Sequence, residues 1–285
     1  MCPILTSRRE RMSKILKSVD ESDLDPVALQ VTGPDAFGFL QAQLTIDLLK
    51  LEPQMLQVTA WCNANGRVAI VLLIAAIDDA YLLTLPRSLA EQALRRIRLY
   101  KIGRKVEVQS IAIEHCRPGD ENALILAHAP QRALRIAAGE AAPGSPAALP
   151  GALLDDIRHG LPWIVATTSD RFLPQTLGLD QLGGLSYRKG CYPGQEVIAR
   201  VHYRGRVTRT LRRFSCAGDS LLQPGLDFGD EHNRATVLYS AIAQPGKVMG
   251  LSVIPAELGT ARLPRLDVAH FEWLDIHPAS LYQEQ

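Results

Sequence analysis

The chain has 285 residues, of which 47% are hydrophobic, and its 31 Lys and Arg nearly balance its 30 Asp and Glu. A chain about twice as long as a common domain predicts two or three domains with cores of their own. The balanced charge argues against a wholly disordered chain and against a protein that coats nucleic acid by bulk charge.

The first predicted elements are a strand and a helix. Residues 27–32 form the strand, and Gly33-Pro34-Asp35 then begins the helix, because proline and an acidic residue favour the first helical turn. The helical spacing of its apolar residues predicts a buried face made by Phe37, Leu40 and Leu44.

A hairpin and a second helix follow. Residues 55–62 alternate apolar and polar side chains, and Asn65-Gly66 is a strong hairpin signal because both residues tolerate positive φ. The returning strand, residues 68–76, is apolar throughout and is therefore predicted to be covered on both faces. A third strand is predicted at 81–85 and a helix at 87–100.

The second half of the chain reads differently. Residues 139–151 are rich in Gly, Pro and Ala, which predicts a linker. Strand-like runs at 207–215, 235–243 and 247–254 predict a small β-barrel or sandwich at the C-terminal end. Strands, hairpins and helices in this order favour an α+β fold over a doubly wound parallel sheet.

Several classes of protein are disfavoured by composition. The longest apolar run, residues 68–77, is about half of the roughly 20 residues that a membrane-spanning helix needs. No secretory signal is visible, so we expect a cytoplasmic protein. The cysteines are odd in number and lack zinc spacing, which argues against a disulfide framework and a permanent metal site; they are Cys2, Cys62, Cys116, Cys191 and Cys216.

Residues 182–213 carry the chemistry. Pro193-Gly194 fits the centre of a type II turn, and residues 196–201 look like a short helix that begins with Glu196. Cys191 would then lie on a loop before a helix N-terminus, beside Arg188 and Lys189. The helix dipole and the cations favour a thiolate, so Cys191 is a candidate reactive thiol or ligand; the alternative is a small buried residue in a turn.

The same segment is basic. Eight Lys and Arg lie between Arg188 and Arg213, against the single acid Glu196. Such a concentration would attract RNA, a nucleotide or a polyglutamylated cofactor. The alternative is a solvated basic face.

The octapeptide Lys189-Gly190-Cys191-Tyr192-Pro193-Gly194-Gln195-Glu196 resembles the K-G-C-[FY]-x-G-Q-E signature of the YgfZ family, the folate-binding relatives of the glycine cleavage T-protein. Other blocks resemble the family in the same order. They are Thr32-Gly33 with Gln43-Leu44-Thr45 and Asp47, Trp61-Cys62-Asn63 with Gly66-Arg67, Phe172-Leu173-Pro174-Gln175, and Leu182-Gly183-Gly184.

The resemblance implies a T-protein-like ring of two interleaved α+β, ferredoxin-like domains and a C-terminal β-barrel around a central folate site. On this chain, residues 20–55 with 152–203 would form the first domain and 56–138 the second. Residues 139–151 would be the linker and 204–280 the barrel.

The resemblance also implies a function: assembly or repair of iron–sulfur enzymes, including a tRNA methylthiotransferase, with tetrahydrofolate or a derivative bound non-covalently. Carried over by motif, Cys191 is the functional thiol. The residues expected to shape its loop and the mouth of the folate cavity are Lys189, Gly190, Tyr192, Gly194, Gln195, Glu196, Asp47 and Gln175.

Two departures from the relatives bear on activity. T-proteins carry a catalytic aspartate in a G-x-x-D-D context, where this chain has Ile70 and Val71. Aliphatic side chains neither accept a proton nor stabilise a cation, so aminomethyl transfer is not expected. Two tryptophans that lie near the pterin in bacterial relatives correspond to Ala152 and to Pro26 or Val27, which weakens the expected stacking by about 1–2 kcal/mol.

Two other functions stay open. The first is a folate-dependent aminomethyltransferase or other one-carbon transferase, favoured by the T-protein pattern and opposed by Ile70 and Val71. The second is an RNA-binding module that uses Arg200, Arg204, Arg206 and Arg209. We rank direct RNA contact last because no stacking aromatic residues accompany these charges.

Overall fold

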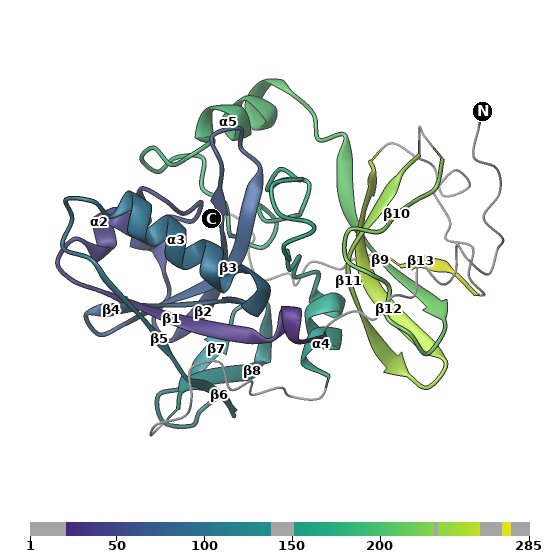
Figure 1. Cartoon of the computed structure of the whole chain (residues 1–285), viewed down its shortest axis with the longest axis horizontal. Coiled ribbons are helices and arrows are strands. Elements are labelled where there is room, and N and C mark those ends of the chain that lie inside the picture. Colours follow the sequence, from purple (N-terminus) through teal and green to yellow (C-terminus); the bar gives the residue numbers. More distant parts are fainter. Residues whose placement is uncertain (1–20, 138–150, 231–232, 257–269, 275–285) are drawn as a thin grey trace.

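The computed structural model describes residues 21–137, 151–230, 233–256 and 270–274 (Figure 1). One part of the molecule carries β1 to β8 with the helices α2 and α3, and a second part is a separate β-sheet. Helix α4 and the segment between α5 and β9 lie where the two parts meet (Figure 1). No helix in the described ranges is long and apolar enough to cross a membrane.

The first part is built on an eight-stranded sheet with the order β5-β1-β4-β3-β2-β7-β8-β6. Neighbouring strands are antiparallel, except that β2 and β7 run parallel. The strands are β1 Pro26–Thr32, β2 Met55–Cys62, β3 Val68–Ile77, β4 Ala80–Pro86, β5 Glu107–Ile111, β6 Ile113–Cys116, β7 Leu124–Leu126 and β8 Ala129–Ile136.

Strand β3 lies at the centre of the core. Its first eight residues, 68–75, are buried, which confirms the prediction that this wholly apolar strand is covered on both faces. It forms the predicted hairpin with β2, yet the connecting loop is longer than two residues. Gly66 has a φ of 72°, but Asn65 is not left-handed. Instead, the Asn63 side-chain oxygen accepts the N–H groups of Asn65 and Arg67 at 2.9 and 3.0 Å, so one left-handed residue suffices.

The helices are short. They are α2 Ala36–Gln41, α3 Ala90–Tyr100, α4 Ala152–His159 and α5 Gln195–Arg204, with 3-10 turns at η1 Glu21–Leu24, η2 Leu48–Lys50 and η3 Arg87–Leu89. The predicted buried face of the first helix is partly wrong. Leu40 and Leu44 are buried as predicted, but Phe37 is exposed. The buried face of α2 is Ala36, Phe39 and Leu40, at i, i+3 and i+4, and Phe37 lies off this face.

The second part is a five-stranded sheet with the order β10-β11-β12-β9-β13. The predicted strand runs are confirmed, and the strands are β9 Arg209–Ala217, β10 Asp227–Phe228, β11 Ala235–Gln244, β12 Lys247–Pro255 and β13 Glu272–Leu274. Phe228 on one edge strand stacks on Trp273 on the other, with ring centroids 6.0 Å apart. The sheet therefore curls into the barrel-like form predicted for this end of the chain.

The two parts are packed together. Tyr239 on β11 is fully buried and donates a hydrogen bond to the Leu161 carbonyl at 2.7 Å. The domain bounds at 55/56 and 203/204 stay a prediction, and β1 shares its sheet with β4 and β5 from beyond residue 56. The predicted linker lies outside the described residues apart from Gly151, which precedes α4.

Candidate functional site

The loop that carries Cys191 runs over the tip of the β2–β3 hairpin and leads into α5 (Figure 1). Cys191 is exposed, whereas Cys62 and Cys216 are buried and Cys116 is half-buried. Burial raises the pKa of the Cys216 thiol to about 11 and that of Cys62 still further, so these two are poor nucleophiles. Among the cysteines of the described ranges, Cys191 is therefore the most accessible to a partner.

Lys189 fastens this loop to the first part of the chain. Its side chain is buried, and its ammonium donates to the carbonyls of Leu44 and Ile46 at 2.8 and 2.7 Å. Burial lowers the Lys189 pKa to about 8, although the nearby Asp47 carboxylate works against this shift. The ammonium is thus held by backbone oxygens, unlike the surface cation that the sequence placed beside Cys191.

The turn after Cys191 is the predicted one. The Gln195 N–H donates to the Tyr192 carbonyl at 3.2 Å across Pro193-Gly194, and Gly194 has a φ of 79°. Gly194 also touches the hairpin: a Cβ atom built on it would lie 2.5 Å from the Asn63 oxygen and from the Gly66 Cα. A glycine is therefore required here both by φ and by close approach.

Tyr192 and the two glutamines hold the backbone of the loop and of α5. The buried Tyr192 hydroxyl donates to the Ser186 carbonyl at 3.1 Å, and its ring lies 5.5 Å from the Lys189 ammonium. Gln195 donates to the Lys189 carbonyl at 3.2 Å. Gln175 donates to the Ile198 carbonyl at 2.8 Å and so supports the first turns of α5.

The remaining predicted residues, Asp47, Gly190 and Glu196, are less directly involved in holding the Cys191 loop. Asp47 caps η2 by accepting the Leu49 N–H, and it also accepts from Gln41 at 2.8 Å. Gly190 and Glu196 are exposed, and a Cβ on Gly190 would meet nothing within 4 Å. Of the predicted residues, the ones whose contacts hold the Cys191 loop or α5 in place are thus Lys189, Tyr192, Gly194, Gln195 and Gln175.

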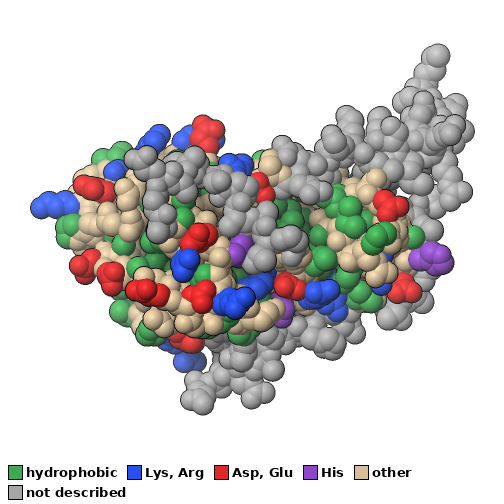
Figure 2. All heavy atoms as spheres, turned by 90° about the horizontal axis from the view of Figure 1, so that it is seen from below, with side chains coloured by type: hydrophobic (Ala, Val, Ile, Leu, Met, Phe, Trp, Pro, Cys, Tyr) green, Lys and Arg blue, Asp and Glu red, His purple; other side chains and the backbone are tan. Residues whose placement is uncertain are grey.

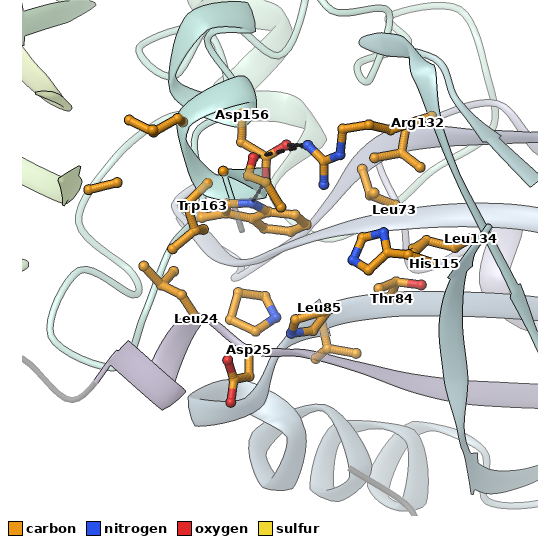
Figure 3. A pocket seen from close by; sticks show the side chains of 18 of the residues that line it. Leu24, Asp25, Leu73, Thr84, Leu85, His115, Arg132, Leu134, Asp156 and Trp163 are labelled. Carbon is orange, nitrogen blue, oxygen red and sulfur yellow. Dashed lines mark hydrogen bonds and ion pairs between the residues drawn. The ribbon is translucent and has the colours of Figure 1, made fainter. Parts of the chain in front are cut away.

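A cavity of about 360 Å³ lies elsewhere, where the eight-stranded sheet, α4 and the C-terminal sheet meet (Figure 3). Its wall is mostly apolar, with a few polar groups from separate strands, as in small-molecule sites. None of the nine residues predicted from the cysteine-loop resemblance is among its lining residues. That the cysteine loop shapes the mouth of a folate site stays a prediction, and the loop does not line this cavity.

Asp156 is the centre of the polar side of this cavity. Its carboxylate accepts from Arg132 at 2.6 Å and from the Trp163 indole at 2.8 Å, and it lies 3.1 Å from the His128 Nε2 (Figure 3). Burial alone would raise the Asp156 pKa, but the His128 hydrogen bond and the Arg132 charge lower it to about 2. The carboxylate is therefore ionised and fixed.

Two buried polar atoms on residues that line the cavity have no hydrogen-bond partner in the described part of the chain. They are the buried Oγ1 of Thr84 and Nε of Arg132. An unpaired buried polar atom costs about 1–3 kcal/mol, so such atoms are commonly paired by water or a ligand. Both atoms are covered by their surroundings, so it is the mixed, mostly apolar lining that makes the cavity a candidate ligand site.

The resemblance aligned two tryptophans of bacterial relatives with Ala152 and with Pro26 or Val27, and Val27 is not among the residues that line this cavity. Ala152 and Pro26 both line it, and so does Trp163, which enters from a different position in the chain. Ile70 and Val71, by contrast, are fully buried in β3 and pair with Trp61 and Ala60 on β2. They have no group that could assist proton transfer.

Sequence reasoning did not single out His128, Arg132, Asp156 or Trp163. His128 is the one polar residue in an otherwise apolar run at 123–129, and this pattern could have indicated a buried polar group. Arg132 and Asp156 lie in mixed segments where nothing marks them. Metal-binding geometry is absent from the described ranges, since no three His, Cys, Asp or Glu residues are grouped suitably.

Comparison with known proteins adds the family context. No protein-family model matches the chain. The tRNA-modifying protein YgfZ of Cronobacter sakazakii is 27% identical and aligns over 83% of this chain and 84% of its own length. The protein of the same name from Vibrio vulnificus is 29% identical, over 81% and 82%, and that from Aliivibrio fischeri is 26% identical, over 94% and 95%. This chain is similar to YgfZ proteins along most of its length.

The resemblance to the YgfZ family that the cysteine loop indicated is thus confirmed. The fold is confirmed by a solved structure, the glycine cleavage system aminomethyltransferase T from Bartonella henselae. It superposes with a TM-score of 0.62 at 13% identity, over 91% of this chain and 85% of the other. At this identity the likeness concerns the fold, which is the T-protein-like α+β arrangement predicted from the sequence.

Proposed function

We propose that this chain is a YgfZ-type factor in tRNA modification. The similarity along four-fifths or more of both chains to proteins named tRNA-modifying protein YgfZ is the observation that carries the proposal. The described part has no membrane-spanning helix, and we propose that the protein works in the cytoplasm.

Within this role, Cys191 is the residue that we propose acts on an iron–sulfur client such as a tRNA methylthiotransferase. Its side chain is exposed while its backbone is fastened by Lys189, Gly194 and Gln195. One thiolate cannot hold a cluster that usually has four protein ligands, so the client supplies the others and Cys191 contacts the cluster transiently.

The cavity at the junction is the site that we propose for tetrahydrofolate or a derivative. Its volume of about 360 Å³ lies in the range of small-molecule sites. The lining includes the aromatic side chain of Trp163 and the polar side chains of Thr84 and Arg132. These groups suit a flat heteroaromatic ring with hydrogen-bonding edges. The folate would be a bound regulator here, because Ile70 and Val71 replace the T-protein carboxylates.

The test is a rescue experiment in cells that lack their own YgfZ protein. Wild-type chain is expected to restore methylthiolated tRNA, measured by mass spectrometry of digested tRNA, and Cys191→Ala and Cys191→Ser are expected to lose at least about 90% of this gain. Cys116→Ala is the matched control, because Cys116 is half-buried and lies on β6. Full rescue by soluble Cys191→Ala would reduce Cys191 to a structural residue.

A further inference from the structure

A second cavity, of about 370 Å³, lies beside the β2–β3 hairpin. Its walls come from residues 171–176, the segment between α5 and β9, and strands β10 and β11 of the C-terminal sheet. This cavity shares no lining residue with the cavity around Asp156. Five of its lining side chains are arginines: Arg67, Arg171, Arg206, Arg209 and Arg234.

One carboxylate faces these five guanidinium groups. Asp227 lines the cavity and accepts from Arg171 at 3.0 and 3.2 Å. Among the described residues that line the cavity, five arginines thus stand against one carboxylate. Like charges gathered around one cavity repel each other, and the repulsion is relieved when an anion enters.

Arg209 lines the cavity, and its guanidinium group is held in place by hydrogen bonds. Its Nη2 donates to the carbonyls of Arg234 and Val253 at 2.8 and 3.1 Å, so the guanidinium is anchored by the protein backbone. Its Nε is buried and has no partner in the described part of the chain. Burial lowers the Arg209 pKa and the charges of Arg171 and Arg234 add to this shift, while the Asp227 carboxylate works against it.

We propose that this arginine cavity binds a phosphate group. Guanidinium groups present forked N–H donors that match phosphate oxygens, and a doubly charged oxyanion offsets several cations at once. The proposal needs neither Cys191 nor the folate cavity, so it goes beyond the proposed function. The phosphate can come from a tRNA backbone or from a small phosphorylated molecule, and the chemistry of the cavity is the same for both.

The position of the cavity favours the tRNA backbone as the source. Arg67 directly follows Gly66, the residue against which Gly194 packs, so the cavity and the Cys191 loop share one hairpin tip. The segment from α5 to β9 then carries Arg206 and Arg209 across to the C-terminal sheet (Figure 1). The face of the molecule shown in Figure 2, by contrast, intersperses acidic and basic side chains.

The experiment compares the wild type with Arg67→Gln/Arg206→Gln and with Arg234→Gln, whose side chains are exposed. The charge-matched control is Arg95→Gln/Arg98→Gln on the exposed face of α3. Inorganic phosphate binding is measured by calorimetry at constant ionic strength, with glutarate as a carboxylate of similar charge. Unmodified tRNA binding is measured by filter binding over a salt series, and circular dichroism checks that each variant is folded.

Phosphate is expected to bind the cavity variants about tenfold or more weakly than the wild type and to bind the control unchanged. If tRNA backbone is the source, the slope of log affinity against log salt falls by about two in the double variant. An unchanged slope with weakened phosphate binding supports the site and identifies a small phosphorylated ligand. The proposal would be overturned if the wild type and the cavity variants bound phosphate equally. It would also be overturned if the wild type bound glutarate as tightly as phosphate.

This outcome is separable from the function proposed for Cys191. Phosphate binding by Cys191→Ala should equal that of the wild type, whatever that variant does in the rescue experiment. If the wild type bound no phosphate in calorimetry but fully restored tRNA modification in the rescue experiment, the phosphate proposal would fail and the proposed function would stand.

Discussion

Asp156 illustrates how one buried charge can be stabilised by its surroundings. Its oxygens accept from Arg132 and Trp163 and meet His128, and together these partners outweigh the cost of burial. Because the folded-state pKa is about 2 and the ordinary value is 3.8, the ionised form favours the folded state. The linked stabilisation is about 2 kcal/mol.

The sign of this linkage gives the pH dependence. A depressed carboxylate pKa adds stability that is present above pH 4 and is lost as the pH falls towards 2. Asp156→Asn is expected to lower the free energy of unfolding by about 3–5 kcal/mol at pH 7, because Arg132 stays buried without its counter-charge. The deficit relative to wild type should shrink when urea unfolding is repeated at pH 3.

The neighbouring Asp155 supplies the control. It forms a partly exposed ion pair with Arg158, so Asp155→Asn should cost less than about 1 kcal/mol at either pH. Equal losses from the two substitutions would show that the Asp156 network contributes no more than an ordinary surface pair.

The cysteine loop and the β2–β3 hairpin depend on each other at the scale of secondary structure. Gly194 ends the loop, begins α5 and packs against Gly66 at the hairpin tip. The hydroxyl of Thr45 donates to the Gly184 carbonyl at 2.6 Å, and Lys189 reaches the carbonyl of Leu44. Segments that are 139 and 145 residues apart in sequence thus form one frame around the exposed thiol.

Substitution of Gly194 by alanine tests this frame. The new Cβ would sit 2.5 Å from Asn63 and Gly66 atoms, and a φ of 79° is unfavourable for alanine. We expect Gly194→Ala to lower the free energy of unfolding by about 2–4 kcal/mol and to speed hydrogen exchange in α5.

Gly190→Ala is the matched variant, since Gly190 is in the same loop and a Cβ there would meet nothing within 4 Å. Its stability in urea should be within about 0.5 kcal/mol of wild type. If both glycine substitutions cost the same, docking on the hairpin does not hold the loop.

The junction cavity belongs to the scale of the whole molecule, because its lining is drawn from both parts. Trp163 lines it, whereas Trp61 lies beneath α2 and Trp273 lies in the C-terminal sheet. If tetrahydrofolate occupies the cavity, it should change the fluorescence of Trp163. Trp163→Phe should abolish most of this change and weaken binding by less than about fivefold in calorimetry, because a phenyl ring still stacks.

Trp273→Phe controls for light absorbed by the folate itself. This variant should keep both the fluorescence change and the affinity of wild type. A change of the same size in the two variants, or no calorimetric binding to any of the three proteins, would place folate elsewhere or exclude it.

The sequence by itself determined the local elements and the cysteine loop. A continuous apolar run located β3, strand-like runs located the C-terminal strands, and Pro193-Gly194 predicted its turn, because these features depend on neighbouring residues. The octapeptide was enough to indicate the YgfZ resemblance that the comparisons confirm.

Only the tertiary structure decided which polar side chains meet. The Asp156 network joins residues from 128 to 163, and the arginine cavity joins residues from 67 to 234, so no local pattern marks either one. The role of Lys189 was likewise decided by burial: its sequence neighbours suggested a surface cation, but the backbone carbonyls of Leu44 and Ile46 take its ammonium. The burial of a side chain and the charges around it depend on all the segments that pack against it. The order of residues in the sequence does not give the distances between those segments.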